Sequence, residues 1–216
     1  MQETQVPPAT DLEFIEARVA ERVRSGEAFF SANAAGIAAC ASAVADRFFA
    51  GATLLVFGSG PHATDAQHNS VEFVHPVLPG CRALPALSLS NDIATVTGIL
   101  HSEAAVEVYA HQLRILGREG DIALAFAHAP MEESVLRALR VARSRGMLTV
   151  ALTSGPDGAP EDLADHQFHA QDPDLLMAHE LHLATYHMLW ELAHIVLNHR
   201  GIGHAVDISA ERPEAV

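Results

Sequence analysis

The sequence predicts an α/β protein, a three-layer sandwich in which helices cover both faces of a five-stranded parallel sheet. Short apolar runs alternate with longer segments of helical periodicity, and strands joined by helices form parallel sheets. The apolar runs carry few charges, as expected of strands that are buried on both faces. The five expected strands are residues 53–57, 83–89, 121–127, 148–153 and 167–170.

Helical patterns fill the rest of the chain. Long N-terminal helices are expected from Thr10 to Ala50, ending in an Ala-rich segment, 34–49. That segment is more apolar than an exposed helix should be, so we expect it, with Cys40, at an interface between subunits. The other expected helices are 92–99, 103–117, 132–145 and 174–198.

Length and composition indicate one soluble domain. The 216 residues suit a single domain at 10–198 between a tail at 1–9 and a tail at 199–216. No basic and apolar secretory leader is visible, and no run reaches the roughly 20 apolar residues of a membrane helix. Two cysteines argue against a disulfide framework and favour a reducing, cytoplasmic location.

Charge and histidine content narrow the functional classes. The net charge of −14 argues against a nucleic-acid partner, which would require clustered Lys and Arg. The 14 histidines outnumber the 13 Lys and Arg residues. Histidine is both a metal ligand and a proton carrier near neutral pH, so the excess points to one of these roles.

Two loops are expected to border a binding site. The loop 58–62 (GSGPH) follows the first strand, and the loop 127–132 (AHAPME) follows the third. In an open parallel sheet, ligands bind beyond the carboxyl ends of the strands, where loops lead into helices. On the helix after the first loop, His68 and Glu72 are four residues apart, so they share one face and can reach one ion.

Four segments, in this order, resemble the phosphoheptose isomerase branch of the sugar-isomerase (SIS) family. They are 54–73 (LLVFGSGPHATDAQHNSVEF), 86–99 (ALSLSNDIATVTGI), 117–121 (GREGD) and 179–187 (HELHLATYH). The resemblance covers most of the chain between about residues 11 and 197. It implies the Rossmann-like SIS fold, a homotetramer (or a dimer) with active sites between subunits, and interconversion of sedoheptulose 7-phosphate with a heptose phosphate through an enediol.

The resemblance also implies roles for individual residues. Glu72 matches the family's general base and His187 its general acid, and some members bind zinc through the positions of His68, Glu72, residue 179 and His187. Position 179 is usually Gln in the family and is His here. A set of three histidines and one glutamate suits zinc, with nickel, copper or iron as alternatives. Eight residues of helix rise roughly 12 Å, so His179 and His187 can bind one ion only if their side chains point toward each other along the helix. His182 is an alternative ligand in place of either residue.

The two loops depart from the family pattern. The resemblance implies serine and threonine hydroxyls that hold a phosphate, but His62 replaces a serine and the second loop has no hydroxyl. Glu132 lies where the next helix begins, and a carboxylate there repels a phosphate dianion. We therefore expect a sugar or related hydroxycarbonyl substrate that is not a standard phosphosugar; a loop that still accepts phosphate through backbone amides and histidines is the alternative. The expected substrate-binding residues are Ser59, His62, Asp92, His128 and Glu132.

The functional prediction is a metal-dependent isomerase with a small-molecule substrate. The metal would polarise a carbonyl, Glu72 would move the neighbouring proton and His187 would donate to oxygen. If the metal holds Glu72 tightly, His62 or His128 must take the proton. Alternatives are a non-catalytic SIS scaffold or ligand sensor, and a hydrolytic, lyase or oxidative metalloenzyme on the same fold. Asp92 could equally serve as a helix cap. Asp65 is expected to be a charged residue in the first turn of its helix, with no further role.

Overall fold

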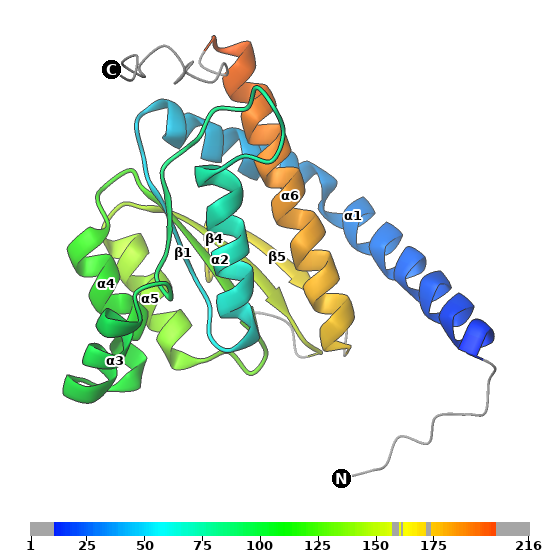
Figure 1. The fold of residues 1–216 in the computed structure, drawn as a ribbon, viewed down its shortest axis with the longest axis horizontal. Coiled ribbons are helices and arrows are strands. Elements are labelled where there is room, and N and C mark those ends of the chain that lie inside the picture. Colours follow the sequence, from blue (N-terminus) through cyan, green and yellow to red (C-terminus); the bar gives the residue numbers. More distant parts are fainter. Residues whose placement is uncertain (1–10, 157–159, 161, 172–173, 202–216) are drawn as a thin grey trace, which may run out of the picture.

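The computed structural model describes residues 11–156, 160, 162–171 and 174–201, and it has the predicted three-layer α/β architecture (Figure 1). All strand pairs are parallel, in the order β2-β1-β3-β4-β5. The strands are β1 (Leu54–Phe57), β2 (Ala86–Ser88), β3 (Ile122–His128), β4 (Leu148–Ser154) and β5 (His166–Ala170). Each lies within a few residues of its predicted position, so the fold prediction is confirmed.

Helices cover both faces of this sheet. They are α1 (Asp11–Phe49), α2 (Pro61–Val74), α3 (Ile93–Ser102), the 3-10 helix η1 (Ala105–Glu107), α4 (Val108–Leu116), α5 (Glu133–Ser144) and α6 (Leu175–His199). Alternate residues of each strand point to opposite faces. Leu54 and Val56 therefore pack into the core formed with α1, α2 and α6. Leu55 and Phe57 pack into a second core formed with α4 and α5.

The N-terminal region is one continuous helix and not two. Helix α1 runs for 39 residues, and Figure 1 shows its first half projecting beyond the body of the domain. No proline interrupts it, and its glycines occur singly among good helix formers, which is not enough to end a helix. Asn33, near the expected break, donates a hydrogen bond from its side-chain Nδ2 to the Phe29 carbonyl oxygen at 2.8 Å.

One face of the Ala-rich half of α1 belongs to the core of its own chain, which corrects the expected interface position of Cys40. The opposite face, with Ala34, Ala35, Ala38 and Ala39, is exposed, and an interface there stays a prediction. Ile37, Val44 and Phe48 are buried in the core, and Cys40 is 0% exposed. This burial explains why the segment is so apolar. Apart from Phe49 at its last position, the exposed large apolar side chains of the helix lie in its first half: Leu12, Phe14, Ile15, Val19 and Val23.

Helix α1 is also long and apolar enough, by length and composition alone, to cross a membrane, and it is the only such helix in the described ranges. Core helices of soluble proteins pass the same test. The second half of α1 contacts the sheet and α6, as a core helix does.

The strand order places a crevice at the carboxyl ends of β1 and β3. From β1 the chain moves to β2 on one side and later to β3 on the other, and ligands bind where the direction of winding reverses. The chain turns sharply there. A Cβ atom at Gly58 would lie 2.8 Å from the His62 Cβ atom and 2.9 Å from the Phe126 carbonyl oxygen. Glycine at position 58 therefore lets helix α2 begin directly beneath the loop.

Candidate active site and metal ligands

A cavity of about 280 Å³ lies beyond the carboxyl ends of β1 and β3. Its walls are the two loops that the sequence pointed to, together with the start of α6. Of the five expected substrate-binding residues, four line it: Ser59, His62, His128 and Glu132. The cavity is therefore the best candidate for a substrate pocket.

Asp92, the fifth residue, has another position. Its carboxylate accepts hydrogen bonds from the Ala94 N–H at 3.0 Å and from the Thr95 hydroxyl at 2.6 Å, which caps α3. The Thr95 hydroxyl and N–H together lower the pKa of Asp92. The residue lines a separate cavity beside β2 and α4, so the helix-cap alternative describes its contacts in this chain.

The polar groups of the pocket are already engaged with protein partners. Tyr109 donates its hydroxyl proton to the Gly58 carbonyl oxygen at 2.7 Å, so Ser59, whose Oγ is 3.3 Å from the same phenol, is the donor in that contact. His128 Nδ1 lies 2.8 Å from Ser154 Oγ. Burial lowers the pKa of His128, as do the neighbouring imidazoles of His62 and two other histidines, so its ring is neutral at neutral pH.

The start of α5 brings a negative charge to the pocket. Glu132 occupies the N-cap position, lines the cavity and makes no side-chain cap hydrogen bond. Glu133 is turned along the helix and pairs with Arg140 at 2.8 Å. A helix N-terminus attracts anions, but here the Glu132 carboxylate already places a negative charge at that position, which disfavours a second anion.

Three of the four expected metal ligands lie together, between α2 and α6. His68, Glu72 and His187 each offer a ligand atom, and these atoms lie within 4.8 Å of one another. His68 Nε2 is 3.2 Å from Glu72 Oε1, as the four-residue spacing on α2 predicts. Glu72 is 8% exposed, whereas the two imidazoles are more accessible, so the group opens toward solvent from a buried carboxylate.

Tyr186 fixes the orientation of His68. Its hydroxyl oxygen is 2.6 Å from His68 Nδ1. Burial raises the pKa of Tyr186, and the negative charges of Asp65 and Glu72 raise it further. The phenol therefore keeps its proton, and the direction of its hydrogen bond with Nδ1 depends on the tautomer of His68. Tyrosine at 186 had no assigned role in the sequence, because its partner lies 118 residues away.

Trp190 holds the backbone of Glu72. Its indole Nε1 donates to the Glu72 carbonyl oxygen at 2.8 Å. In a continuing helix the N–H of residue 76 would make that bond, but residue 76 is proline and has no N–H. Trp190 thus satisfies an orphan carbonyl at the end of α2.

His179, the fourth expected ligand, lies elsewhere. Its Nδ1 is 2.9 Å from Asp65 Oδ2, and its ring stacks on that of His62 with centroids 4.8 Å apart. The helical rise between residues 179 and 187 separates it from His187, as the rise argument anticipated. The structure thus groups His179 with the pocket and not with the three ligands around Glu72.

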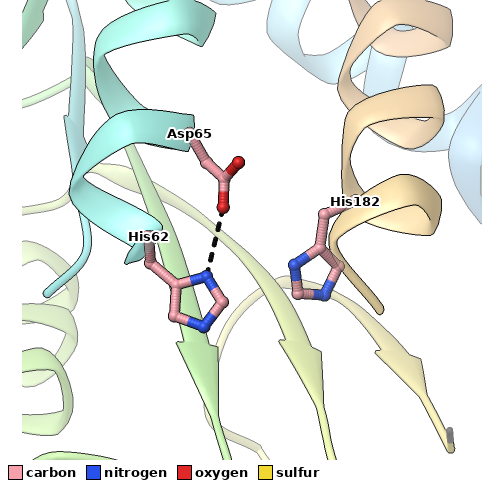
Figure 2. A group of neighbouring side chains, drawn as sticks. All are labelled: His62, Asp65 and His182. Carbon is pink, nitrogen blue, oxygen red and sulfur yellow. Dashed lines mark hydrogen bonds and ion pairs between the residues drawn. The ribbon is translucent and has the colours of Figure 1, made fainter. Parts of the chain in front are cut away.

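His182, the rival ligand, belongs to a second group of candidate ligands. His62, Asp65 and His182 each offer an atom within 4.8 Å of the others, and Figure 2 shows the two histidines facing each other from α2 and α6. Burial lowers the pKa of His182 to about 4, and the Thr153 carbonyl oxygen opposes this shift. Asp65, expected only as a first-turn charge, is therefore the centre of a cluster.

Comparison with known proteins agrees with the fold. A family model described as "SIS domain" matches residues 19–154. A phosphoheptose isomerase from Thermodesulfovibrio yellowstonii is 33% identical over 177 residues, which cover 82% of this chain and 88% of the relative. A phosphoheptose isomerase from Desulfovibrio desulfuricans is 33% identical over 84% of this chain and 86% of the relative.

Solved structures give the same result. A phosphoheptose isomerase from Francisella tularensis superposes with a TM-score of 0.79 at 26% identity, over 86% of this chain and 98% of that one. The enzyme from Neisseria gonorrhoeae superposes with a TM-score of 0.76 at 25% identity, over 85% and 98%. The fold and the pocket at β1 and β3 thus define a SIS-domain protein. The chain belongs to the SIS domain family, in its phosphoheptose isomerase branch.

Proposed function

We propose that the protein is an aldose–ketose isomerase that acts through an enediol on a hydroxycarbonyl substrate. One observation carries the proposal: His68, Glu72 and His187 converge between α2 and α6 in a chain whose relatives are isomerases. Isomerisation requires a group that takes a proton from carbon and a group that donates to the neighbouring oxygen. Glu72 and His187 supply one of each.

Glu72 is the proposed base. Its side chain is 10% exposed and approaches His68 through one oxygen, at 3.2 Å, so the other carboxylate oxygen is available to take a proton. His187 is the proposed donor. Burial lowers the pKa of His187, Glu72 raises it and His68 lowers it, with a net lowering. A neutral imidazole can still donate its N–H to an oxygen that gains charge.

The ligand chemistry of the same group fits a divalent transition metal. Two imidazoles and a carboxylate leave a fourth position open, as in catalytic zinc sites. Tyr186 also fits, because with a metal on Nε2 the ring proton of His68 would lie on Nδ1, which would donate it to the Tyr186 hydroxyl oxygen and so hold the ring. When bound, such an ion would polarise the substrate carbonyl. Zinc is the first choice, and nickel, copper and iron share its preference for nitrogen.

The pocket supports a substrate without a standard phosphate. The Ser59 hydroxyl donates its hydrogen bond to Tyr109 and not to a ligand. The second loop has no hydroxyl before Ser134, and Glu132 places a negative charge at the start of α5. His62 and His128 replace the missing hydroxyls with imidazoles. A neutral or cationic group fits this lining better than a dianion.

Paired substrates test the proposal. The purified protein would be mixed with sedoheptulose or with sedoheptulose 7-phosphate, and isomerisation followed by NMR, with binding measured by calorimetry. We expect turnover of hydroxycarbonyl compounds that lack the phosphate. Micromolar binding and turnover of the phosphorylated sugar would contradict the substrate assignment while keeping the isomerase. No turnover of any hydroxycarbonyl compound, phosphorylated or not, would contradict the isomerase itself.

Self-association is part of the same proposal. The first half of α1 exposes five large apolar side chains, Leu12, Phe14, Ile15, Val19 and Val23. Contiguous exposed apolar surface of this kind marks an interaction site. We propose a homotetramer, or a dimer, that covers this face, with light scattering after size exclusion as the test. A cytoplasmic location stays a prediction from the cysteine content.

A further inference from the structure

We propose that His62, Asp65 and His182 form a second binding site for a transition-metal ion of the zinc type, separate from the group around Glu72. The site lies between the first turn of α2 and the second turn of α6, beside the pocket (Figure 2). It does not depend on the proposed proton roles of Glu72 and His187, because neither residue is one of its ligands.

Ligand identity and spacing support the ion. Two imidazoles and one carboxylate form a donor set typical of zinc and related metals. His62 Nδ1 is 3.2 Å from Asp65 Oδ2, close to the roughly 3.3 Å between ligand atoms of a tetrahedral zinc site. The three ligand atoms lie within 4.8 Å of one another, so the His182 ring must approach by at most about 1.5 Å to complete the shell.

His182 provides an independent indication of a missing partner. The residue is 0% exposed, and neither ring nitrogen has a hydrogen-bond partner of good geometry among the described residues. A buried polar group left in this state costs about 1–3 kcal/mol. Its ring is neutral, so one nitrogen offers a lone pair to a cation. Figure 2 shows that ring turned toward His62 and Asp65.

The surroundings favour a cation over an anion. The Asp65 carboxylate is the negative centre of the cluster, and His179 Nδ1 contacts its Oδ2 at 2.9 Å. A histidine that bonds to a ligating carboxylate orients it for the metal. Two of the positions where this chain differs from the family pattern, 62 and 179, are the histidines that flank Asp65. An ion here would border the pocket, because His62 and His179 line it.

Metal stoichiometry in matched variants tests the proposal. Metal-free full-length protein would be loaded with zinc, freed of excess metal and analysed by mass spectrometry for ions per chain. His62→Asn and Asp65→Asn remove ligands of the proposed site, Glu72→Gln removes one from the other group, and His101→Asn is the control for a histidine that lies on the exposed surface of α3. Circular dichroism would verify that each variant is folded. Cobalt loading adds a visible absorption band that reports ligand geometry without any activity.

The expected result is two ions per chain in the wild type and in His101→Asn, and one ion in each of the other variants. One ion that is lost in His62→Asn and Asp65→Asn but kept in Glu72→Gln would also support the site, and would contradict the metal group of the proposed isomerase. A stoichiometry unchanged in His62→Asn and Asp65→Asn would overturn the site. A wild type that binds a single ion, which all three ligand variants lose, or a wild type that binds none, would overturn it as well.

Discussion

The bond between the Trp190 indole and the Glu72 carbonyl oxygen predicts a large effect of Trp190→Phe. Phenylalanine keeps most of the buried ring but has no N–H, and Pro76 cannot supply one. The change leaves a buried carbonyl unpaired, which costs about 1–3 kcal/mol. We expect the free energy of unfolding to fall by about 1–3 kcal/mol.

Urea unfolding followed by far-UV circular dichroism measures this loss, since Trp190 is the only tryptophan and its fluorescence disappears with it. Pro76→Ala provides the matched test, because it restores an N–H at the end of α2. In the Trp190→Phe background it should recover about 1 kcal/mol more than it does in the wild type, as expected for coupled residues. Strictly additive effects, or a loss below about 0.5 kcal/mol, would refute the reasoning.

Three further predictions concern other parts of the chain. Burial raises the pKa of Cys40 to about 12, so a thiol reagent should modify the half-buried Cys81 first and Cys40 only on unfolding; mass spectrometry that finds both labelled at one rate would contradict the core position of α1. Burial raises the pKa of Asp165, but hydrogen bonds from the Thr149 N–H and hydroxyl outweigh it and lower the pKa. Its stabilising contribution is therefore present above about pH 4 and is lost as the pH falls further; unfolding curves of wild type and Asp165→Asn should converge in acid, and a constant difference would argue against this. Glu132→Gln should tighten binding of inorganic phosphate about three- to tenfold, since it removes one like charge at a helix start; calorimetry that finds no change would place that carboxylate outside the pocket's electrostatic reach.

The layers and the pocket position could be predicted because they depend on local patterns. Short apolar runs mark buried strands, and the loops 58–62 and 127–132 follow two of them directly. Parallel strands bring their carboxyl ends to one edge, so the two loops had to meet. The spacing of His68 and Glu72 likewise determines their shared helix face.

The contacts between α2 and α6 could not be predicted in the same way. Which residues of α6 meet α2 depends on the rotation and height of one helix against the other, and this is decided by packing over more than a hundred residues of intervening chain. Tyr186 against His68 and His179 against Asp65 are results of that packing. The Ala-rich half of α1 shows the same limit, because an apolar helix face indicates burial but not whether the chain itself or a partner covers it.

Solvent-proton exchange in Glu72→Gln tests the central claim most directly. An enediol mechanism exchanges the transferred hydrogen with solvent, so turnover in heavy water labels the carbon beside the carbonyl. The account predicts labelled product with wild-type protein and with Glu191→Gln, an exposed carboxylate on the same helix as His187. It predicts a loss of at least about a hundredfold in Glu72→Gln. Labelling by Glu72→Gln at the wild-type rate would show that Glu72 does not carry the proton.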